Sequence, residues 1–188
     1  MVKNNSRSSR VGEYLTYEEY QLIYNQARKN KNRERRKRDT TLIELLWRTG
    51  LRIGDVLDLR INDIILDENT IRRKLQKTGK LVEIPIPPEL TEKILDIYDV
   101  ERRKDGRIFT IKYEWVREFI RDYAEEAGIN KNVHPHMFRH GMATYLLNVK
   151  GVDMKTISNI LGHKSIAITA DIYTDITLDK KRKALDLA

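Results

Sequence analysis

The sequence contains no cysteine, only four prolines, and no apolar run long enough to cross a membrane. The missing cysteine excludes disulfide bonds and cysteine-based zinc sites. The start of the chain is polar and basic with no apolar stretch behind it, so it resembles neither a signal peptide nor a membrane anchor. We therefore expect a protein of a reducing interior compartment. Of its 188 residues 40% are hydrophobic, which is enough to bury one core.

Positive charge is abundant, and it is concentrated in a few stretches. The formal net charge is +8. Residues 28–38 carry +7, residues 72–80 carry +5 and the first ten residues carry +3, so the rest of the chain carries −7. A concentrated basic surface usually faces a polyanion. No basic helix with bulky apolar anchors accompanies it, which favours nucleic acid over a membrane. A solvated helix end is the alternative for residues 28–38.

The secondary-structure signals predict a mainly helical fold with one small three-stranded antiparallel sheet, an α+β class. Thr16 and Glu19 form a capping-box pattern that predicts a helix start. Three segments alternate as strands do and are separated by short polar turns: residues 61–66, 70–76 and 81–86. Residues 1–12 are expected to be a disordered tail. Helices are expected over residues 16–29, 38–49, 53–59, 89–98, 112–127, 135–149, 153–161, 165–173 and 178–187.

Histidine is scarce, and three of the four histidines fall near possible chemistry. His136 and Arg139 are three residues apart in an expected helix, so they share a face. The apolar stripe of that helix, which runs from Phe138 to Val149, lies on the other side. We therefore expect both polar side chains to point away from the core or into a cleft. His163 follows a Leu-Gly helix stop, at the start of a tight turn.

Three further residues are candidates for phosphate chemistry. Arg52 begins an expected helix, where an anion is favoured and an arginine can add a bidentate phosphate contact; an ion pair with Asp55 is the alternative. Lys77 lies at the tip of the basic hairpin and can donate a proton, with Lys80 as a nearby competitor. Tyr173 is one of nine tyrosines. Only roughly one phenol in a thousand is ionised at pH 7, so a tyrosine nucleophile needs a base or a positive field.

Taken in order, these segments resemble the tyrosine recombinase (phage integrase) family. Five motifs carry the resemblance: Thr49-Gly50-Leu51-Arg52, Lys77, His136-Met137-Phe138-Arg139-His140, Leu161-Gly162-His163 and Ile172-Tyr173-Thr174. Each motif is weak alone, but together they follow the family's order and cover most of the chain. The resemblance implies the family's catalytic-domain fold and a site-specific DNA recombinase or integrase.

The resemblance also implies how the reaction runs. Arg52 and Arg139 would clamp the scissile phosphate, and Tyr173 would attack it to form a 3′-phosphotyrosine. Rejoining would be the reverse attack by a 5′-hydroxyl. Because the covalent link conserves the energy of the broken bond, the resemblance implies no metal, no ATP and no other cofactor.

Other residues receive supporting roles from the same resemblance. His136 would assist proton transfer, Lys77 would protonate the departing 5′-oxygen, and His163 would donate a hydrogen bond to the phosphate. Asp55 stands where family members often carry glutamate three residues after the first arginine. The shorter carboxylate would orient Arg52 from behind.

The implied partners are double-stranded DNA and further copies of the chain. We expect a tetramer on DNA, a monomer in solution and a cytoplasmic, nucleoid-associated protein without a membrane partner. The segment 178–187 would dock on a neighbouring copy or on its own domain. The residues expected to bind DNA are Arg35, Arg36, Lys37, Arg38, Arg72, Arg73, Lys74 and Lys80.

The expected domain organisation is a catalytic domain over residues 13–188 after the basic tail. Many family members have an N-terminal core-binding domain that completes a clamp around DNA. Only about fifty residues precede Arg52, too few for that domain. The chain is therefore expected to be either a fragment or one of the shorter, single-domain members.

Three other functions are compatible with part of the sequence. His134-Pro135-His136 is a His-x-His pair of the kind found in metal-dependent nicking enzymes, but Pro135 argues against the central strand that such a pair needs. A DNA-binding module of the same fold that does not cut is the second alternative. A type IB topoisomerase is the third, disfavoured by the Leu-Gly-His motif and the short chain.

Overall fold

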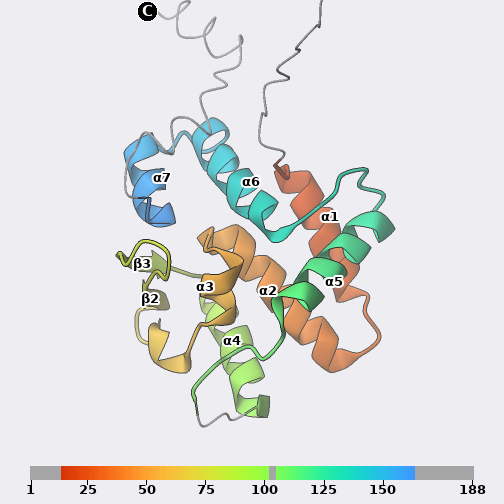
Figure 1. Cartoon of the computed structure of the whole chain (residues 1–188), viewed down its shortest axis with the longest axis horizontal. Coiled ribbons are helices and arrows are strands. Elements are labelled where there is room, and N and C mark those ends of the chain that lie inside the picture. The colour runs from red at the N-terminus through yellow and green to blue at the C-terminus, as the bar shows by residue number, and fades with distance from the viewer. Residues whose placement is uncertain (1–13, 102–104, 164–188) are drawn as a thin grey trace, which may run out of the picture.

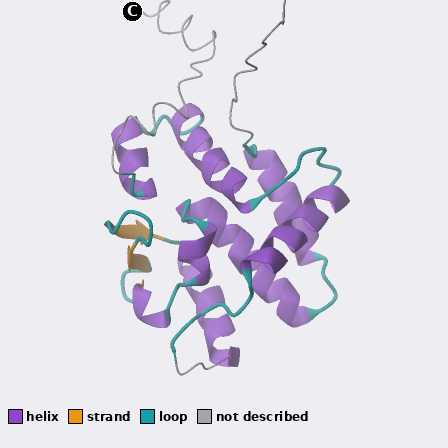
Figure 2. Cartoon of the chain, in the orientation of Figure 1, coloured by secondary structure: helices purple, strands orange, loops and turns teal. Residues whose placement is uncertain are grey.

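The computed structural model describes residues 14–101 and 105–163 (Figure 1). The helices of this part are α1 (Tyr17–Arg28), α2 (Arg33–Thr49), α3 (Ile53–Leu57), α4 (Pro88–Glu101), α5 (Tyr113–Glu126), α6 (Pro135–Asn148) and α7 (Met154–Leu161). A short 3-10 helix, η1 (Ile61–Asp63), precedes the strands β1 (Ile64–Ile65), β2 (Thr70–Lys74) and β3 (Leu81–Pro85). The predicted fold class, mainly helical with one small antiparallel sheet, is confirmed (Figure 2).

Helix α2 is the central element of the helical part. Its residues from Asp39 to Trp47 are all buried, because α1, α4 and α6 pack around it. The helix begins at Arg33, five residues earlier than predicted. Asn32 accepts a hydrogen bond from the backbone N–H of Arg35 at 2.9 Å and so caps the helix. The second half of the basic run, residues 33–38, therefore forms the first turns of α2.

The sheet is smaller than the alternating pattern predicted. Its order is β1-β2-β3, with Ile71 paired to Ile64 on one side and to Ile84 on the other. The predicted strand 61–66 is half replaced by η1. Asp63 accepts the backbone N–H of Arg60 at 2.9 Å, which closes a tight turn where the strand was expected.

Two glycines with positive φ bring the elements of the site together. Gly50 ends α2 with a φ of 60°, and a Cβ there would collide with Met142 of α6. Gly162 ends α7 with a φ of 62°, and a Cβ there would collide with Leu75 of the β2–β3 hairpin. Only glycine tolerates both the backbone conformation and the close approach. The ends of α2 and α7, helix α6 and the hairpin therefore meet in one region (Figure 1).

Some expectations lie outside the described residues. These are the disordered tail over residues 1–12 and the helices over residues 165–173 and 178–187. Within the described ranges, no helix combines the length and the apolar character that crossing a membrane requires.

Candidate active site

A cleft of about 430 Å³ lies between α3, the turn of the β2–β3 hairpin and the start of α6. Its polar lining comes from Arg52, Asp55, Gln76, Lys77, His134 and His136. Three of the residues predicted to be catalytic thus lie in one cleft although they come from three distant parts of the chain. The arginine and the lysine give this cleft positive charge suited to an anion.

Arg52 is placed at the mouth of this cleft by the turn that follows α2. It is the N-cap residue of α3, and its side chain is half-buried. Its Nη1 atom is buried and has no hydrogen-bond partner in the described part of the chain. A buried N–H without a partner is unfavourable, and it costs more on a charged group. An anion that enters the cleft would supply the missing acceptor.

Arg139 is held behind the cleft. Only 3% of it is exposed and it does not line this cleft, whereas the helical spacing predicted that it points away from the core or into a cleft. Its Nη1 donates to the carbonyl of Gly50 at 2.6 Å, and its Nη2 donates to the carbonyl of Leu161 at 2.8 Å. These carbonyls end α2 and α7, where the helix dipoles favour a cation. The predicted apolar stripe of α6 is also shorter than expected, because Val149 is 67% exposed.

The histidines of the site are kept neutral by their surroundings. Desolvation, followed by the neighbouring His140 and Arg139, lowers the pKa of His136 to about 4. Desolvation and the charges of Arg139 and Arg52 lower the pKa of His163 to about 4 as well. The His136 and His140 rings meet edge to face, 4.5 Å apart. At neutral pH both low-pKa imidazoles can therefore accept a proton.

The two lysines at the hairpin turn have different surroundings. Lys77 is exposed and lines the cleft with Arg52 and His136. Lys80 instead donates from Nζ to Oδ1 of Asn159 on α7 at 3.3 Å. Of the two competitors, Lys77 therefore has the position that proton donation in the cleft requires.

Asp55 makes its contacts with the hairpin. It is buried, and its Oδ1 accepts the backbone N–H of Gln76 at 2.9 Å and lies 3.9 Å from Nε of Arg73. These contacts do not include Arg52, so they do not support the expectation that Asp55 orients Arg52. Its carboxylate joins α3 to the hairpin instead.

Arg73, expected to bind DNA, faces the interior and needs a correction. Only 6% of it is exposed, and its guanidinium forms ion pairs with Asp58 at 2.8 Å and Asp63 at 3.0 Å. Its neighbours Arg72 and Lys74 point to the exposed face of the hairpin. Arg72 pairs there with Glu83 on β3 at 2.6 Å.

The basic run at the start of α2 lies far from the cleft. From Arg35 to Gly50 the helix rises by roughly 22 Å. Lys37 forms an ion pair with Asp96 at 2.6 Å, and Arg36 donates to the carbonyl of Asn30 at 3.1 Å. These cations already have partners within the chain.

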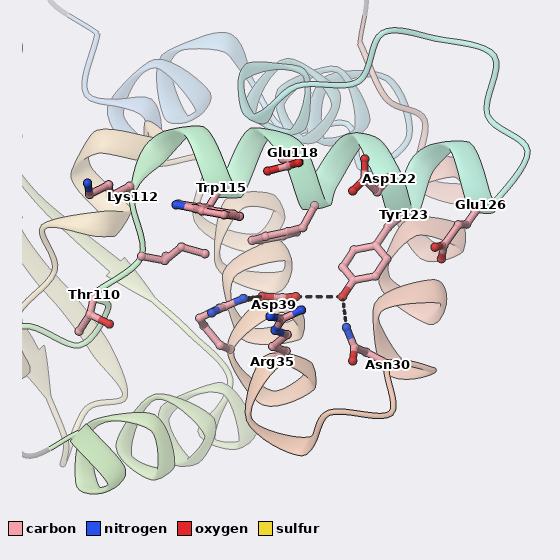
Figure 3. A pocket seen from close by; sticks show the side chains of 13 residues that line it. Asn30, Arg35, Asp39, Thr110, Lys112, Trp115, Glu118, Asp122, Tyr123 and Glu126 are labelled. Carbon is pink, nitrogen blue, oxygen red and sulfur yellow. Dashed lines mark hydrogen bonds and ion pairs between the residues drawn. The ribbon is translucent and has the colours of Figure 1, made fainter.

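Arg35 and Arg38 line a second cavity, of about 680 Å³, between α2 and α5 (Figure 3). Arg38 donates to Asp39 at 2.8 Å and lies 6.0 Å from the centre of the Phe119 ring. Asp39 also accepts the hydroxyl of Tyr123 at 2.9 Å, as the dashed line in Figure 3 marks. This network stabilises the packing of α5 on α2, and none of its residues lines the cleft of Arg52.

Sequence reasoning missed three residues of the cleft. Gln76, His134 and Tyr113 all line it. His134 was weighed only as half of a metal-binding pair. It is the N-cap residue of α6, with Pro135 in the first turn, so the His-x-His pair begins a helix, not a strand. Over the described ranges, no group of three or more metal-ligating side chains is arranged to hold a metal ion.

Tyr173, the predicted nucleophile, lies outside the described residues. The five other predicted catalytic residues are described. Arg52, Lys77 and His136 line the cleft. Arg139 lies close enough to His136 and to His163 to lower the pKa of both, and Arg52 also lowers the pKa of His163.

Comparisons with known proteins agree with this architecture. Residues 13–179 match the family model described as the phage integrase family. "Tyrosine recombinase XerA" of Thermococcus kodakarensis is 34% identical over 166 residues, which cover 81% of this chain and 56% of that protein. The chain spans about half to two thirds of the length of the curated relatives it matches.

Two solved structures are similar to the chain. The crystal structure of XerA recombinase has a TM-score of 0.75 and 27% identity, over 93% of this chain and 64% of that one. XerH site-specific recombinase bound to its difH substrate in a pre-cleavage complex has a TM-score of 0.78 and 26% identity, over 93% of this chain and 54% of that one.

Proposed function

The chain belongs to the phage integrase family, and we propose that it is the catalytic part of a site-specific recombinase that cuts and rejoins double-stranded DNA. The observation that carries the proposal is the cleft in which Arg52, Lys77 and His136 meet, with a buried Nη1 of Arg52 awaiting an acceptor. A phosphodiester supplies that acceptor and a scissile bond at once. The covalent link forms on Tyr173, and the active unit is a tetramer on two DNA sites.

The arginines stabilise charge on the phosphate in this proposal. Arg52 donates from its unpartnered Nη1 to a nonbridging oxygen. Arg139, fixed by the carbonyls of Gly50 and Leu161, adds a positive charge that does not need to reorganise. A preorganised donor of this kind contributes about 3–4 kcal/mol to the stabilisation of a transition state.

Proton transfer falls to the histidine and the lysine. The phenol of Tyr173 gives up its proton as its oxygen attacks phosphorus, and His136, which is neutral in the free protein because its pKa is about 4, takes that proton. The negative charge of the bound phosphate raises the pKa of His136 and so makes it a stronger base. Lys77 donates a proton to the 5′-oxygen as the phosphorus–oxygen bond breaks. His163 holds a nonbridging oxygen, and no metal or nucleotide takes part.

The proposed DNA-binding surface is the exposed face of the β2–β3 hairpin. Arg72, Lys74 and Lys80 lie on this hairpin beside Lys77, within reach of a duplex whose phosphate occupies the cleft. Arg73 is excluded because it is buried and paired. We also leave out Arg35, Arg36, Lys37 and Arg38, which lie at the opposite end of α2.

The test traps the covalent intermediate. The 188-residue chain is incubated in EDTA with nicked duplexes that carry a randomised central sequence, so that the short downstream fragment that carries the freed 5′-hydroxyl is lost after cleavage. We expect an adduct that resists denaturation, with the phosphate mapped to Tyr173 by mass spectrometry. Sequencing the trapped DNA then gives the preferred site.

The controls separate this proposal from its alternatives. Tyr173→Phe should bind the same DNA without forming an adduct. An adduct on another residue would overturn the nucleophile assignment. Salt-sensitive DNA binding without any adduct would favour a DNA-binding module that does not cut, and a requirement for metal would favour the nicking enzyme.

A further inference from the structure

A buried arginine lies under the hairpin that carries Lys77. Arg73 shares its face of β2 with the buried Ile71 and Leu75. Its Nη1 donates to the carbonyl of Asp58 at 2.8 Å and to Oδ2 of Asp63 at 3.0 Å. Its Nη2 donates to Oδ2 of Asp58 at 2.8 Å. A cation that is buried among carboxylates in this way cannot contact DNA, so its charge must serve another purpose.

The same carboxylates hold the residue next to Lys77. Asp55, which lies 3.9 Å from Nε of Arg73, accepts the backbone N–H of Gln76 at 2.9 Å. Asp58 accepts from Nε2 of Gln76 at 3.1 Å. Gln76 is therefore fixed through both its main chain and its side chain by acids that Arg73 holds together.

We propose that Arg73 is a positioning residue for the proton-donating step, which it controls through Asp55, Asp58 and Gln76. The inference rests on the proposed function, in which Lys77 protonates the leaving 5′-oxygen. A proton donor must lie within hydrogen-bond reach of its acceptor, and a displacement of about 1 Å can cost two orders of magnitude in rate. Without Arg73 the carboxylates repel one another and release Gln76, and the lysine beside it loses its fixed position.

The step that Arg73 would govern has a defined balance of atoms. The Tyr173 oxygen forms a bond to phosphorus, the bond from phosphorus to the 5′-oxygen breaks, and that oxygen takes a proton from Lys77. When sulfur replaces the bridging 5′-oxygen, the leaving group departs as a thiolate, which needs no proton in order to leave because thiol pKa values lie near 8.5, far below those of alcohols. A sulfur substrate therefore does not need the lysine.

The test compares cleavage of the two substrates in single-turnover reactions at saturating DNA, with the duplex selected by the trapping experiment. Lys77→Ala should cleave the oxygen substrate about 100- to 1,000-fold more slowly than the unaltered protein and recover with sulfur. Arg73→Met should lose about 10- to 100-fold with oxygen and should recover in the same way. Its sulfur-to-oxygen rate ratio should rise at least about tenfold above that of the unaltered protein.

Arg72→Met is the matched control. It removes the same side chain from the adjacent position, on the exposed face of β2, where Arg72 pairs with Glu83 on β3. It should weaken DNA binding but leave the sulfur-to-oxygen ratio at saturating DNA unchanged. Arg52→Met should be slow with both substrates, because a phosphate clamp acts whatever atom leaves.

The outcomes separate this inference from the function on which it rests. A Lys77→Ala defect that sulfur does not relieve overturns the assignment of Lys77 and the inference with it. Relief at Lys77 but none at Arg73 overturns the inference alone, since Arg73 would then be a structural residue. If thermal unfolding shows that Arg73→Met does not fold, Asp58→Ala carries the same test. Asp58 is only half-buried, and its replacement removes the side-chain contact that it makes with Arg73 and with Gln76.

Discussion

The two ends of helix α2 carry arginines in opposite conditions. At the start of the helix, Arg36 donates to the carbonyl of Asn30, whereas Lys37 and Arg38 form ion pairs with Asp96 and Asp39. Just beyond its C-terminal end, Arg52 keeps a buried Nη1 that has no hydrogen-bond partner among the described residues. The end with fewer cations is thus the one that is prepared for an anion.

The difference lies in how the cations are held, not in how many there are. Arg139 is bonded to backbone carbonyls, which orient its guanidinium without neutralising it as a carboxylate would. After desolvation, the charge of Arg139 is the next cause that lowers the pKa of the nearby His163. A density of basic residues along the sequence therefore indicates a site less well than unsatisfied charge in the fold does.

The largest expected effect comes from removing the unsatisfied charge. Arg52→Met should slow formation of the covalent adduct by about 100- to 1,000-fold. Its midpoint of thermal unfolding should not fall, because a buried N–H without a partner contributes nothing favourable to folding. Single-turnover kinetics and thermal unfolding measure the two effects.

Arg139→Met serves as the comparison for that variant. It should lose activity to a similar degree but also destabilise the fold by about 2–4 kcal/mol, since two buried carbonyls lose charged donors. If Arg52→Met is destabilised equally, then Arg52 contributes to the stability of the fold as much as Arg139 does, and the contrast between the two arginines is wrong.

The sequence predicted which residues meet better than how they are held. The motifs around Arg52, Lys77 and His136 singled out residues that line one cleft, because local turns and helix starts determine where those side chains begin; their catalytic roles stay predictions. The burial of Arg139 was not predictable from its own helix, since its acceptors belong to Gly50 and Leu161 at the ends of two other helices. Long-range contacts of this kind leave no periodic signal.

Arg73 was predicted wrongly although a signal was present. Strand alternation places it on the same face as Ile71 and Leu75, which are both buried. Charge counting gave Arg73 the same weight as Arg72, but their side chains point to opposite faces. The three aspartates that form ion pairs with Arg73 are Asp55 in α3, Asp58 at the C-cap of α3 and Asp63 in η1, and only the fold brings them together.

A smaller effect should appear in the pH dependence of stability. The pKa of His163 is about 4 in the folded chain and near 6.5 when unfolded, so the unfolded chain takes up the proton first as the pH falls. Stability should therefore be lost between about pH 6.5 and pH 4. From pH 7.5 to pH 5 the unaltered chain should lose roughly 1–2 kcal/mol more than His163→Gln in urea unfolding. Parallel curves for the two proteins would mean that the folded chain does not lower the pKa of His163 in this way.

The smallest expected effect belongs to the start of α2. Lys37→Ala removes a partly exposed ion pair with Asp96, so the free energy of unfolding should change by no more than about 1 kcal/mol. The salt dependence of DNA affinity should stay the same, whereas Lys74→Ala on the hairpin should reduce the slope of log K against log salt by about 0.9, as expected for one lost phosphate contact. Fluorescence anisotropy of a labelled duplex between low and moderate salt measures both slopes. A reduced slope for Lys37→Ala would place DNA at both ends of the helix, and the compensated cations would then have to exchange their carboxylates for phosphates on binding.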